Sequence, residues 1–523
     1  MRSWPITTDV AQTDWFFGLI LIISPSVLAM QTRPSGSLVS NRLPGCLRLD
    51  AAAGMLADAI RADLRRGSEA GIIRRYEIGI EEVDPLAWLA PQPRGERLYF
   101  RNREGSLTIA GIGCCLASAR LSDPGVANCL RSESNDFPET GQPSEPLFFV
   151  VNWFDPETAR RDPGRWLGFA PARVVLPRIE VRRTRETVLA VNVCADAALA
   201  LDALEGMDAA TAIPQIAHGL QMTADGDPAR WADAIDGALA AIAAGSVEKV
   251  VLARTREYGA LESIDPCAAL AALRSEEPAA FHVLVEQSPS CAFIAASPER
   301  LYKRKGNLIH SEAVAGTCTR GPDGVSDERL AARLLASEKN LREHACVVRR
   351  IESALAPLTG SLTRDPCPKV MRLRHVQHLM TGVVGHLNGA VSDEAILGSL
   401  HPTPAVCGWP LAESRAFIRE NESCARGLYA GVVGVVSASR SDFTVAIRSA
   451  VIDGASMTAF AGAGIVRGSE ADAEWLETAR KLESFDGLVR RAAQGPSLAQ
   501  GSGAPAQRRV LRSRQSESVV EVS

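Results

Sequence analysis

Lys249 interrupts an apolar segment, VEKVVLAR, and both residues two positions away from it, Val247 and Val251, are apolar. On a β-strand these three side chains point to one face, so burial of the lysine is expected. A buried lysine loses its charge readily and can act as a neutral general base. Glu299 ends the segment CAFIAASPE. It is a candidate acid, although a turn cap or a surface residue would occupy the same position.

Acidic residues on two expected helices offer oxygen ligands. Glu474, Glu477 and Lys481 share one face of the last helix, and an exposed Glu–Lys ladder worth about 0.3–0.5 kcal/mol per pair would account for them as well. Together with Glu343 on an earlier helix, Glu477 would suit Mg²⁺, which prefers oxygen ligands and retains waters. No spacing rule proves that the two helices meet. His378, beside apolar residues in RLRHVQHLMTG, is by itself more typical of a packed core histidine.

Other groups could hold an anionic substrate. Arg448 alternates with apolar residues in TVAIRSA, so on a strand it would face inward and require an anionic partner. Tyr429 on a neighbouring strand could add a hydroxyl. Gly462, Gly464 and Gly468 lie between a strand and the last helix, where glycines let backbone N–H groups approach an anion, although a tight turn also uses them. Taken together, these residues indicate a small polyanionic substrate held on Mg²⁺.

The composition is that of a globular protein. The chain has 523 residues, of which 46 % are hydrophobic and 23 % charged, which excludes a mainly disordered, collagen-like or polytopic membrane protein. The net charge of −4 provides no basic excess for binding nucleic acid. Its 12 cysteines form no CxxC pair, so a zinc site is not expected. Scattered cysteines suit a reducing compartment, and a cytoplasmic location is expected.

The order of elements predicts an α+β fold with large antiparallel sheets. A helix is expected over 50–66, a meander-like set of short strands over 70–225, and a helix over 227–245 that ends at Gly245. Strands then form a hairpin over 281–297, followed by one long helical stretch over 326–358. Three strands (427–437, 442–453 and 457–466) and a final helix over 470–494 complete the chain.

The chain ends differ from this pattern. Residues 15–23 (WFFGLILII) are too few to span a bilayer. The segment before them matches the start of a signal peptide poorly. Met30 is therefore a candidate start, and a form attached to a membrane through residues 15–23 is an alternative. We divide the chain into a variable extension (1–45), a divergent N-terminal part (46–225), a catalytic region (226–493) and a disordered tail (494–523).

Nine segments between residues 249 and 482 together resemble the chorismate-utilising enzymes, and within them the isochorismate synthases. The segments are KVVLAR (249–254), SPERL (297–301), EAVAGT (312–317), SEKNLREH (337–344), HVQHLMT (375–381), HPTPAVCGWP (401–410), YAGVVG (429–434), AIRSA (446–450) and AGAGIVRGSEADAEWLETARKL (461–482). The resemblance implies the chorismate-binding fold, with antiparallel sheets packed face to face and helices outside.

The resemblance also implies roles for individual residues. Lys249 would activate water, Glu299 would protonate the departing hydroxyl, and Glu343 and Glu477 would bind Mg²⁺. Glu474 would support the metal site. The remaining residues would bind substrate: Gly316, Thr317, His378, Tyr429, Arg448, Gly462, Gly464 and Lys481.

The implied reaction is Mg²⁺-dependent isomerisation of chorismate to isochorismate, for menaquinone or siderophore biosynthesis. Ala315 stands where some relatives carry a lysine nucleophile, and HPTPAVCGWP differs from the segment of anthranilate synthases. Ammonia chemistry and a glutamine amidotransferase partner are therefore not expected, and the default is a monomer. A salicylate synthase, which also eliminates pyruvate, and a non-catalytic chorismate-binding relative are the alternatives. Departures at Asn340, Leu341, Val435 and Val436 concern substrate positioning.

Overall fold

The computed structural model describes residues 38–66, 73–130, 144–157, 164–194 and 196–494. The strands are β1 (Leu38–Leu47), β2 (Ile73–Ile80), β3 (Arg97–Arg101), β4 (Thr108–Ser118), β5 (Phe148–Asn152), β6 (Ala172–Arg183), β7 (Thr187–Val193), β8 (Gln221–Ala224), β9 (Lys249–Gly259), β10 (Phe281–Glu286), β11 (Cys291–Ser297), β12 (Arg300–Lys305), β13 (Leu308–Thr319), β14 (Thr359–Arg364), β15 (Lys369–Arg372), β16 (Val376–Leu387), β17 (Gly408–Trp409), β18 (Val432–Val436), β19 (Arg440–Val445), β20 (Ser449–Asp453) and β21 (Ser456–Ile465). The α-helices are α1 (Leu49–Arg65), α2 (Pro85–Leu89), α3 (Pro124–Leu130), α5 (Ala197–Glu205), α6 (Pro228–Ala243), α7 (Pro266–Glu276), α8 (Gly324–Ala336), α9 (Glu338–Leu355), α10 (Asp393–Leu400), α11 (Leu411–Asn421) and α12 (Ala471–Gln494).

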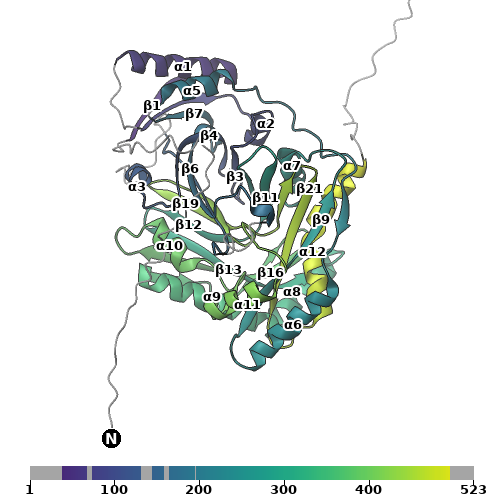
Figure 1. Ribbon diagram of the computed structural model, residues 1–523. Coiled ribbons are helices and arrows are strands. Elements are labelled where there is room, and N and C mark those ends of the chain that lie inside the picture. Colours follow the sequence, from purple (N-terminus) through teal and green to yellow (C-terminus); the bar gives the residue numbers. More distant parts are fainter. Residues whose placement is uncertain (1–37, 67–72, 131–143, 158–163, 195, 495–523) are drawn as a thin grey trace, which may run out of the picture.

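Strand β6 is the junction of the hydrogen-bonded sheet, because it pairs with β4, β5 and β7. A first arm continues from β4 through β3, β10, β11, β20 and β21 to β9. A second arm continues from β5 through β18, β19, β12 and β13 to β16. All of these pairs are antiparallel, so the expected α+β architecture with large antiparallel sheets is confirmed (Figure 1).

The expected meander over 70–225 is only partly present. Strand β4 pairs with β6 rather than with the next strand, and β5 pairs on its other side with β18. Strand β3 likewise pairs with β10. Strands from both sides of residue 225 therefore complete each arm, because a short strand from the N-terminal part satisfies its backbone on a strand far away in sequence.

The chain passes between the two arms at two short connections. Pro298 and Glu299 join β11 of the first arm to β12 of the second, and residues 446–448 join β19 of the second arm to β20 of the first. The prediction of one strand over 442–453 is therefore wrong. Arg448 has φ +49°, a left-handed conformation that interrupts the strand.

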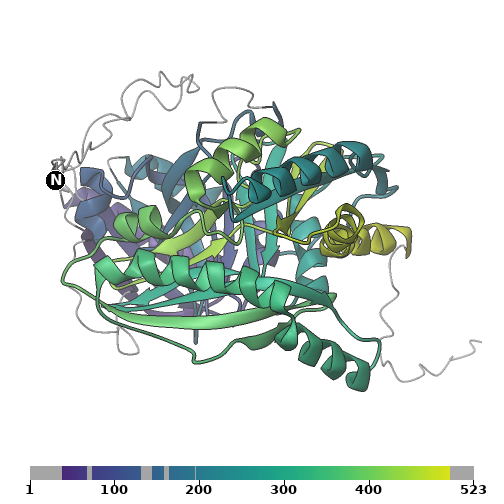
Figure 2. The same ribbon diagram turned by 90° about the horizontal axis from the view of Figure 1, so that it is seen from below.

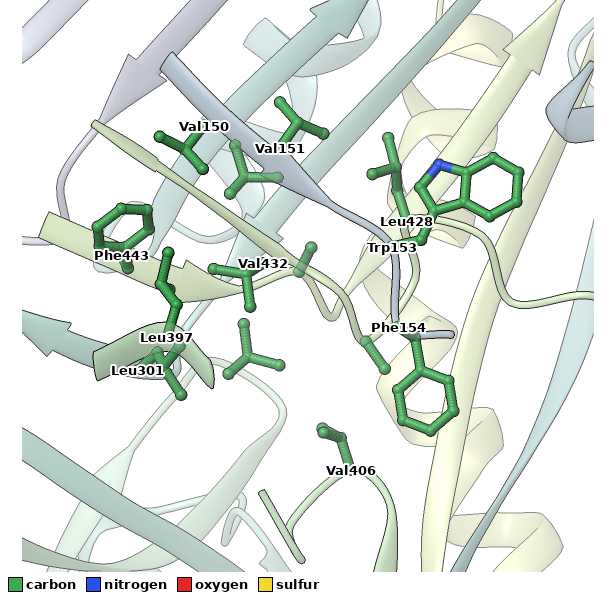
Figure 3. Packing of buried hydrophobic residues seen from close by; sticks show 14 of the residues in the cluster. Val150, Val151, Trp153, Phe154, Leu301, Leu397, Val406, Leu428, Val432 and Phe443 are labelled. Atoms are coloured by element: carbon green, nitrogen blue, oxygen red, sulfur yellow. The ribbon is translucent and has the colours of Figure 1, made fainter. Parts of the chain in front are cut away.

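Two apolar cores lie on opposite faces of the first arm. Alternate residues of β11 contribute to each: Phe293 and Ala295 pack in the core shared with the second arm, whereas Ile294 and Ala296 pack in the core under the helices. This alternation is the two-residue period of a strand that is buried on both faces. Figure 3 shows part of the shared core, where side chains from β5, β12, β18 and β19 converge.

Helices cover the outer faces of both arms, as the two views in Figures 1 and 2 agree. Residues of α1, α2, α7 and α12 pack in the second of the two cores, and α9 contacts β13 and β16. The expected helix over 326–358 is two helices, because Ser337 is extended (φ −76°, ψ 108°) and its side chain accepts a hydrogen bond from the Asn340 N–H, which caps α9. The helix stop at Gly245 is confirmed by its φ of +77°.

Among the described helices, none is long and apolar enough to cross a membrane. The apolar segment 15–23 and the tail from residue 495 lie outside the described residues.

Replacement of Phe443 by alanine should lower the stability strongly. This ring is fully buried in the shared core and its centroid lies 5.0 Å from that of Tyr302. We expect a loss of about 3–5 kcal/mol, because truncation of a core aromatic removes apolar burial and leaves a cavity. The midpoint of urea unfolding measures it. Leu261→Ala is the control, since this side chain is 87 % exposed and should change stability by about 0.5 kcal/mol or less. Equal midpoints for both variants would contradict the burial of Phe443 in the shared core.

Candidate active site

A cavity lies where the two connections between the arms meet β13, β16, β21 and α12. Most residues proposed from the sequence line it: Glu299, Gly316, Thr317, Glu343, His378, Tyr429, Arg448, Gly462, Gly464, Glu477 and Lys481. Lys249 lies behind Glu343, and Glu474 is one helical turn from Glu477 on α12; neither lines the cavity.

Lys249 and Glu343 form a buried ion pair. The side chain of Lys249, at the start of β9, is 2 % exposed, and its Nζ lies 2.9 Å from Oε1 of Glu343 on α9. The contact is an ion pair rather than an aligned hydrogen bond. Burial opposes ionisation of Glu343, but Lys249, Lys481 and Lys339 together hold the pKa of this carboxyl below its ordinary value.

Gly464 makes room for this pair. It lies within β21, opposite Val251 of β9. A Cβ atom at this position would overlap Oε1 of Glu343 and would lie 2.8 Å from Cε of Lys249. Gly462, two residues earlier on the same face, leaves space for the Tyr429 hydroxyl, which would lie 2.7 Å from an added Cβ.

The expectation that Gly462 and Gly464 form an anion-binding turn before the last helix is therefore wrong. Both belong to β21, and of the three glycines only Gly468 lies between β21 and α12, with φ +87°. The first two glycines are required by close packing, whereas Gly468 supplies the turn.

The carboxylates of α12 are paired with lysines. Lys481 Nζ donates hydrogen bonds to Glu477 Oε1 (2.7 Å) and to the Gly462 carbonyl (2.8 Å), which fixes the helix against β21. Lys339 Nζ donates to Glu474 Oε1 at 2.8 Å. Glu474 is 2 % exposed, and its burial, together with the neighbouring Glu477, raises its pKa.

The carboxylates that line the cavity are candidate ligands for Mg²⁺. Among the described residues no group of three His, Cys, Asp or Glu side chains could hold a metal. Glu343 and Glu477 nevertheless line one cavity. Two carboxylates suit an ion that takes its other ligands from water and from the substrate, as Mg²⁺ commonly does. The residues present therefore fit such an ion.

Glu299 lines the cavity, and its carboxyl has a raised pKa. The residue is 4 % exposed. Burial raises its pKa to about 8, and the Glu312 carboxylate adds to the rise, while Lys249 and Lys481 oppose it. Its carbonyl accepts hydrogen bonds from Thr444 Oγ1 (2.7 Å) and from the Val445 N–H (3.1 Å). A fixed carboxyl that is protonated at neutral pH can serve as a general acid.

Arg448 is a cation without a close partner. It is 4 % exposed, its Nη1 lies 3.9 Å from Glu277 Oε1, and that nitrogen donates no hydrogen bond among the described groups. Because a buried guanidinium needs an anion, the cavity favours a substrate carboxylate at this position. Tyr429 lines the same wall, in the turn before β18 rather than on a strand as expected.

His378 and Thr317 also line the cavity. Nδ1 of His378 lies 3.0 Å from Oγ1 of Thr317, and burial, with the charges of Arg448 and Lys481, lowers the pKa of this histidine well below its ordinary value. The imidazole is therefore neutral. Asn340 Oδ1 accepts the Thr317 N–H at 3.3 Å and so supports the Gly316–Thr317 backbone.

The residues that depart from the family segments lie both at the cavity wall and away from it. Asn340 supports the cavity wall, whereas Val435 and Val436 lie on β18 within the shared core, away from the cavity. Neither valine contributes a group to the site.

Sequence reasoning missed two residues whose buried side chains brace the site, Arg426 and Glu422. Arg426 donates hydrogen bonds to the carbonyls of Val251 (2.8 Å) and Val406 (2.7 Å), both of which line the cavity. Glu422 accepts from Arg426 Nε at 2.8 Å and from the Ala253 N–H at 2.8 Å. Their spacing of four residues in NESCARG was the available signal, but such pairs are usually exposed.

Comparison with known proteins relates the chain to chorismate-binding enzymes. The family described as "Chorismate binding enzyme" matches residues 59–489. The isochorismate synthase MenF of Escherichia coli is 32 % identical over 418 residues, which are 78 % of this chain and 91 % of that protein. The salicylate biosynthesis isochorismate synthase of Pseudomonas aeruginosa is 35 % identical over 430 residues, covering 78 % and 88 %.

Solved structures are similar as well. The structure of the menaquinone-specific isochorismate synthase MenF from Escherichia coli has a TM-score of 0.72 and 30 % identity, covering 83 % of this chain and 99 % of that one. Anthranilate synthase component I from Streptococcus pneumoniae shares the fold, with a TM-score of 0.58, 20 % identity, and coverage of 73 % and 92 %. The expected chorismate-binding fold is thus confirmed, and the chain belongs to the chorismate-binding enzymes.

Proposed function

We propose that this protein is an isochorismate synthase, which isomerises chorismate to isochorismate. The observation that carries the proposal is Glu299: a protonated carboxyl lines the same cavity as Glu343, the partner of Lys249, and as Arg448, whose Nη1 donates no hydrogen bond among the described groups. An acid and a base at one site suit a reaction in which a hydroxyl is added at one ring carbon and lost from another. The names of the relatives support the same reaction.

Chorismate carries two carboxylates, and the cavity offers two places for them. Arg448 and Tyr429 would hold the enolpyruvyl carboxylate, since Nη1 of the guanidinium lies 3.9 Å from Glu277 Oε1 and donates no hydrogen bond among the described groups. The ring carboxylate would lie near Glu343 and Glu477, which would hold Mg²⁺. The ion, when bound, would neutralise charge on that carboxylate.

Lys249 and Glu299 would carry the proton transfers. Lys249 would take a proton from the water that adds at C2 of the ring, and to do so it must first give up the proton that it holds in its ion pair with Glu343. The ring double bonds shift, and the C4 hydroxyl leaves with the proton of Glu299 as water. One water enters and one leaves, so the reaction is an isomerisation. Glu299 suits this role because its carboxyl keeps its proton at neutral pH.

Ala315 favours water as the nucleophile. This residue lines the cavity beside Gly316, is 7 % exposed, and its carbonyl contacts His344 Nδ1 at 3.2 Å. A methyl group offers no competing amine at that position. The released product would be isochorismate for menaquinone or siderophore biosynthesis.

A product assay tests the proposal. The protein is incubated with chorismate and Mg²⁺, with and without EDTA, and the products are separated by chromatography. We expect isochorismate that EDTA suppresses, without stoichiometric pyruvate. Equal amounts of salicylate and pyruvate would identify a salicylate synthase instead, and the absence of turnover by folded protein would indicate a binding role.

Activity should fall on the alkaline side because of Glu299. Its carboxyl is protonated below its pKa of about 8 and loses the proton as the pH rises through that value. The profile of kcat/KM, which reports the free enzyme, should therefore decline there. Glu299→Gln should reduce kcat by about 10²-fold or more, and its residual activity should lack this decline. A decline that persists unchanged in the variant would assign it to another group.

Gly464→Ala should impair turnover while leaving a folded protein. The added Cβ would displace the Glu343 carboxylate and the Lys249 side chain, and a misplacement of about 1 Å can cost about 10²-fold in rate. Circular dichroism and kcat measure the two effects. Gly398→Ala on α10 is the matched control, because nothing lies within 4 Å of its added Cβ. Normal kcat in Gly464→Ala would show that this pair need not be held in place.

A further inference from the structure

The two-residue connection that carries Glu299 has few backbone partners of its own. Pro298 and Glu299 lie between β11 and β12, outside the ladders of both arms. Ser297 Oγ accepts the Glu299 N–H at 3.3 Å, and the Glu299 carbonyl accepts from Thr444 Oγ1 and from the Val445 N–H. The Pro298 carbonyl accepts instead from Arg103 Nη1 at 3.0 Å. Arg103 lies in the turn between β3 and β4, almost two hundred residues earlier in the chain (|i−j| = 195).

Arg103 also holds Glu312, the carboxylate whose charge acts on Glu299. Its Nη1 and Nη2 donate to Glu312 Oε2 (2.9 Å) and Oε1 (2.6 Å), a bidentate pair. Arg300 Nη1 contacts Glu312 Oε1 at 3.3 Å as well. The side chains of Arg103 and Glu312 are 19 % and 13 % exposed, so solvent screens the pair only partly.

The turn that carries Arg103 is itself fixed. Asn102 is 1 % exposed, its Oδ1 accepts the Leu107 N–H at 3.1 Å, and its Nδ2 donates to Asp442 at 3.4 Å. Asp442 lies on β19 and accepts from Arg300 Nε at 3.1 Å. The turn therefore reaches the second arm through side chains that are already ordered, so Arg103 is presented to the connection in one place.

We propose that Arg103 is a positioning residue for Glu299, acting through the Pro298 carbonyl and the Glu312 carboxylate. The inference rests on the proposed function of Glu299 as the acid. Arg103 touches neither the cavity nor the reacting atoms. Arg103 holds Glu299 in place through the Pro298 carbonyl. It also neutralises the Glu312 carboxylate, whose charge acts on Glu299.

Several charged groups act on Glu299, and they come from different elements. Lys249 on β9, Lys481 on α12 and Glu312 on β13 act on it directly. Further charged or titratable groups line the same cavity: Glu343, Glu477, His378 and Arg448. Glu312 is itself paired with Arg103 and Arg300, whose other partners are Glu104 and Asp442. A change at Arg103 or Glu312 alters the charge beside Glu299 without replacing any group that lines the cavity.

The experiment compares Arg103→Gln and Glu312→Gln in the full chain. Arg103→Gln should lower kcat by about ten- to a hundredfold, since the acid is less well placed. It should also shift the alkaline decline of kcat/KM to higher pH, because the Glu312 charge is less neutralised and disfavours ionisation of Glu299. Glu312→Gln removes that charge and should shift the decline to lower pH. A merely structural role would change stability without opposite shifts in the two profiles.

Matched variants complete the test. Arg173→Gln breaks another Arg–Glu pair, in which Arg173 Nη2 lies 3.2 Å from Glu96 Oε1 and the arginine side chain has the same 19 % exposure, away from the cavity. Both kcat and the pH profile should remain as in the native protein. Arg103→Lys keeps the charge and should restore the native position of the decline, with kcat between those of Arg103→Gln and the native protein. It also serves if Arg103→Gln fails to fold.

Different results would refute the positioning role of Arg103 and the acid role of Glu299. Native kcat and an unmoved decline in Arg103→Gln, while Glu299→Gln is inactive, would overturn the positioning role and leave the acid in place. Native activity in Glu299→Gln would overturn the role of the acid itself, and the positioning role with it.

Discussion

The Lys249–Glu343 ion pair constrains much of the surrounding structure. A lysine and a carboxylate buried together are tolerated only if each remains close to the other, because either charge alone is costly to bury. The pair joins the start of β9 to α9, and the neighbouring strand must leave space for it. Gly464 supplies that space, since a Cβ there would overlap the carboxylate. The glycine, the lysine and the glutamate are thus one structural unit.

The same rule organises the other charged groups around the cavity. The chain has 57 basic residues, of which only six are lysines; three of these, Lys249, Lys339 and Lys481, are paired with Glu343, Glu474 and Glu477. An ammonium ion is compact and can release a carboxylate when a stronger cation approaches, whereas a bidentate guanidinium holds it more firmly. Arginines accordingly brace the outer network, at Glu312 and Glu422.

The sequence predicted the chemical groups better than their geometry. The antiparallel α+β class, the hairpin of β10 and β11, and the burial of Lys249 follow from local patterns, because apolar alternation is a property of neighbouring residues. Arg448 was misplaced on a strand because a left-handed residue leaves no mark in an alternating pattern. The contributions of Arg103 and Arg426 could not be found from the sequence, since each depends on contacts with residues more than a hundred positions away.

The two connections between the arms explain why acid and anion site lie together. Strands β11 and β12 and strands β19 and β20 leave one arm and enter the other side by side, as their pairings require. Glu299 and Arg448 each occupy one of these connections, where their carbonyls accept the Val445 N–H and the Ala296 N–H respectively, and both residues line the cavity between the arms. The fold thus brings one group that keeps its proton and one that needs an anion to a single cavity. The dianionic ring with a departing hydroxyl that we propose as the substrate would satisfy both, and it would complete the electrostatics that the folded chain leaves unbalanced.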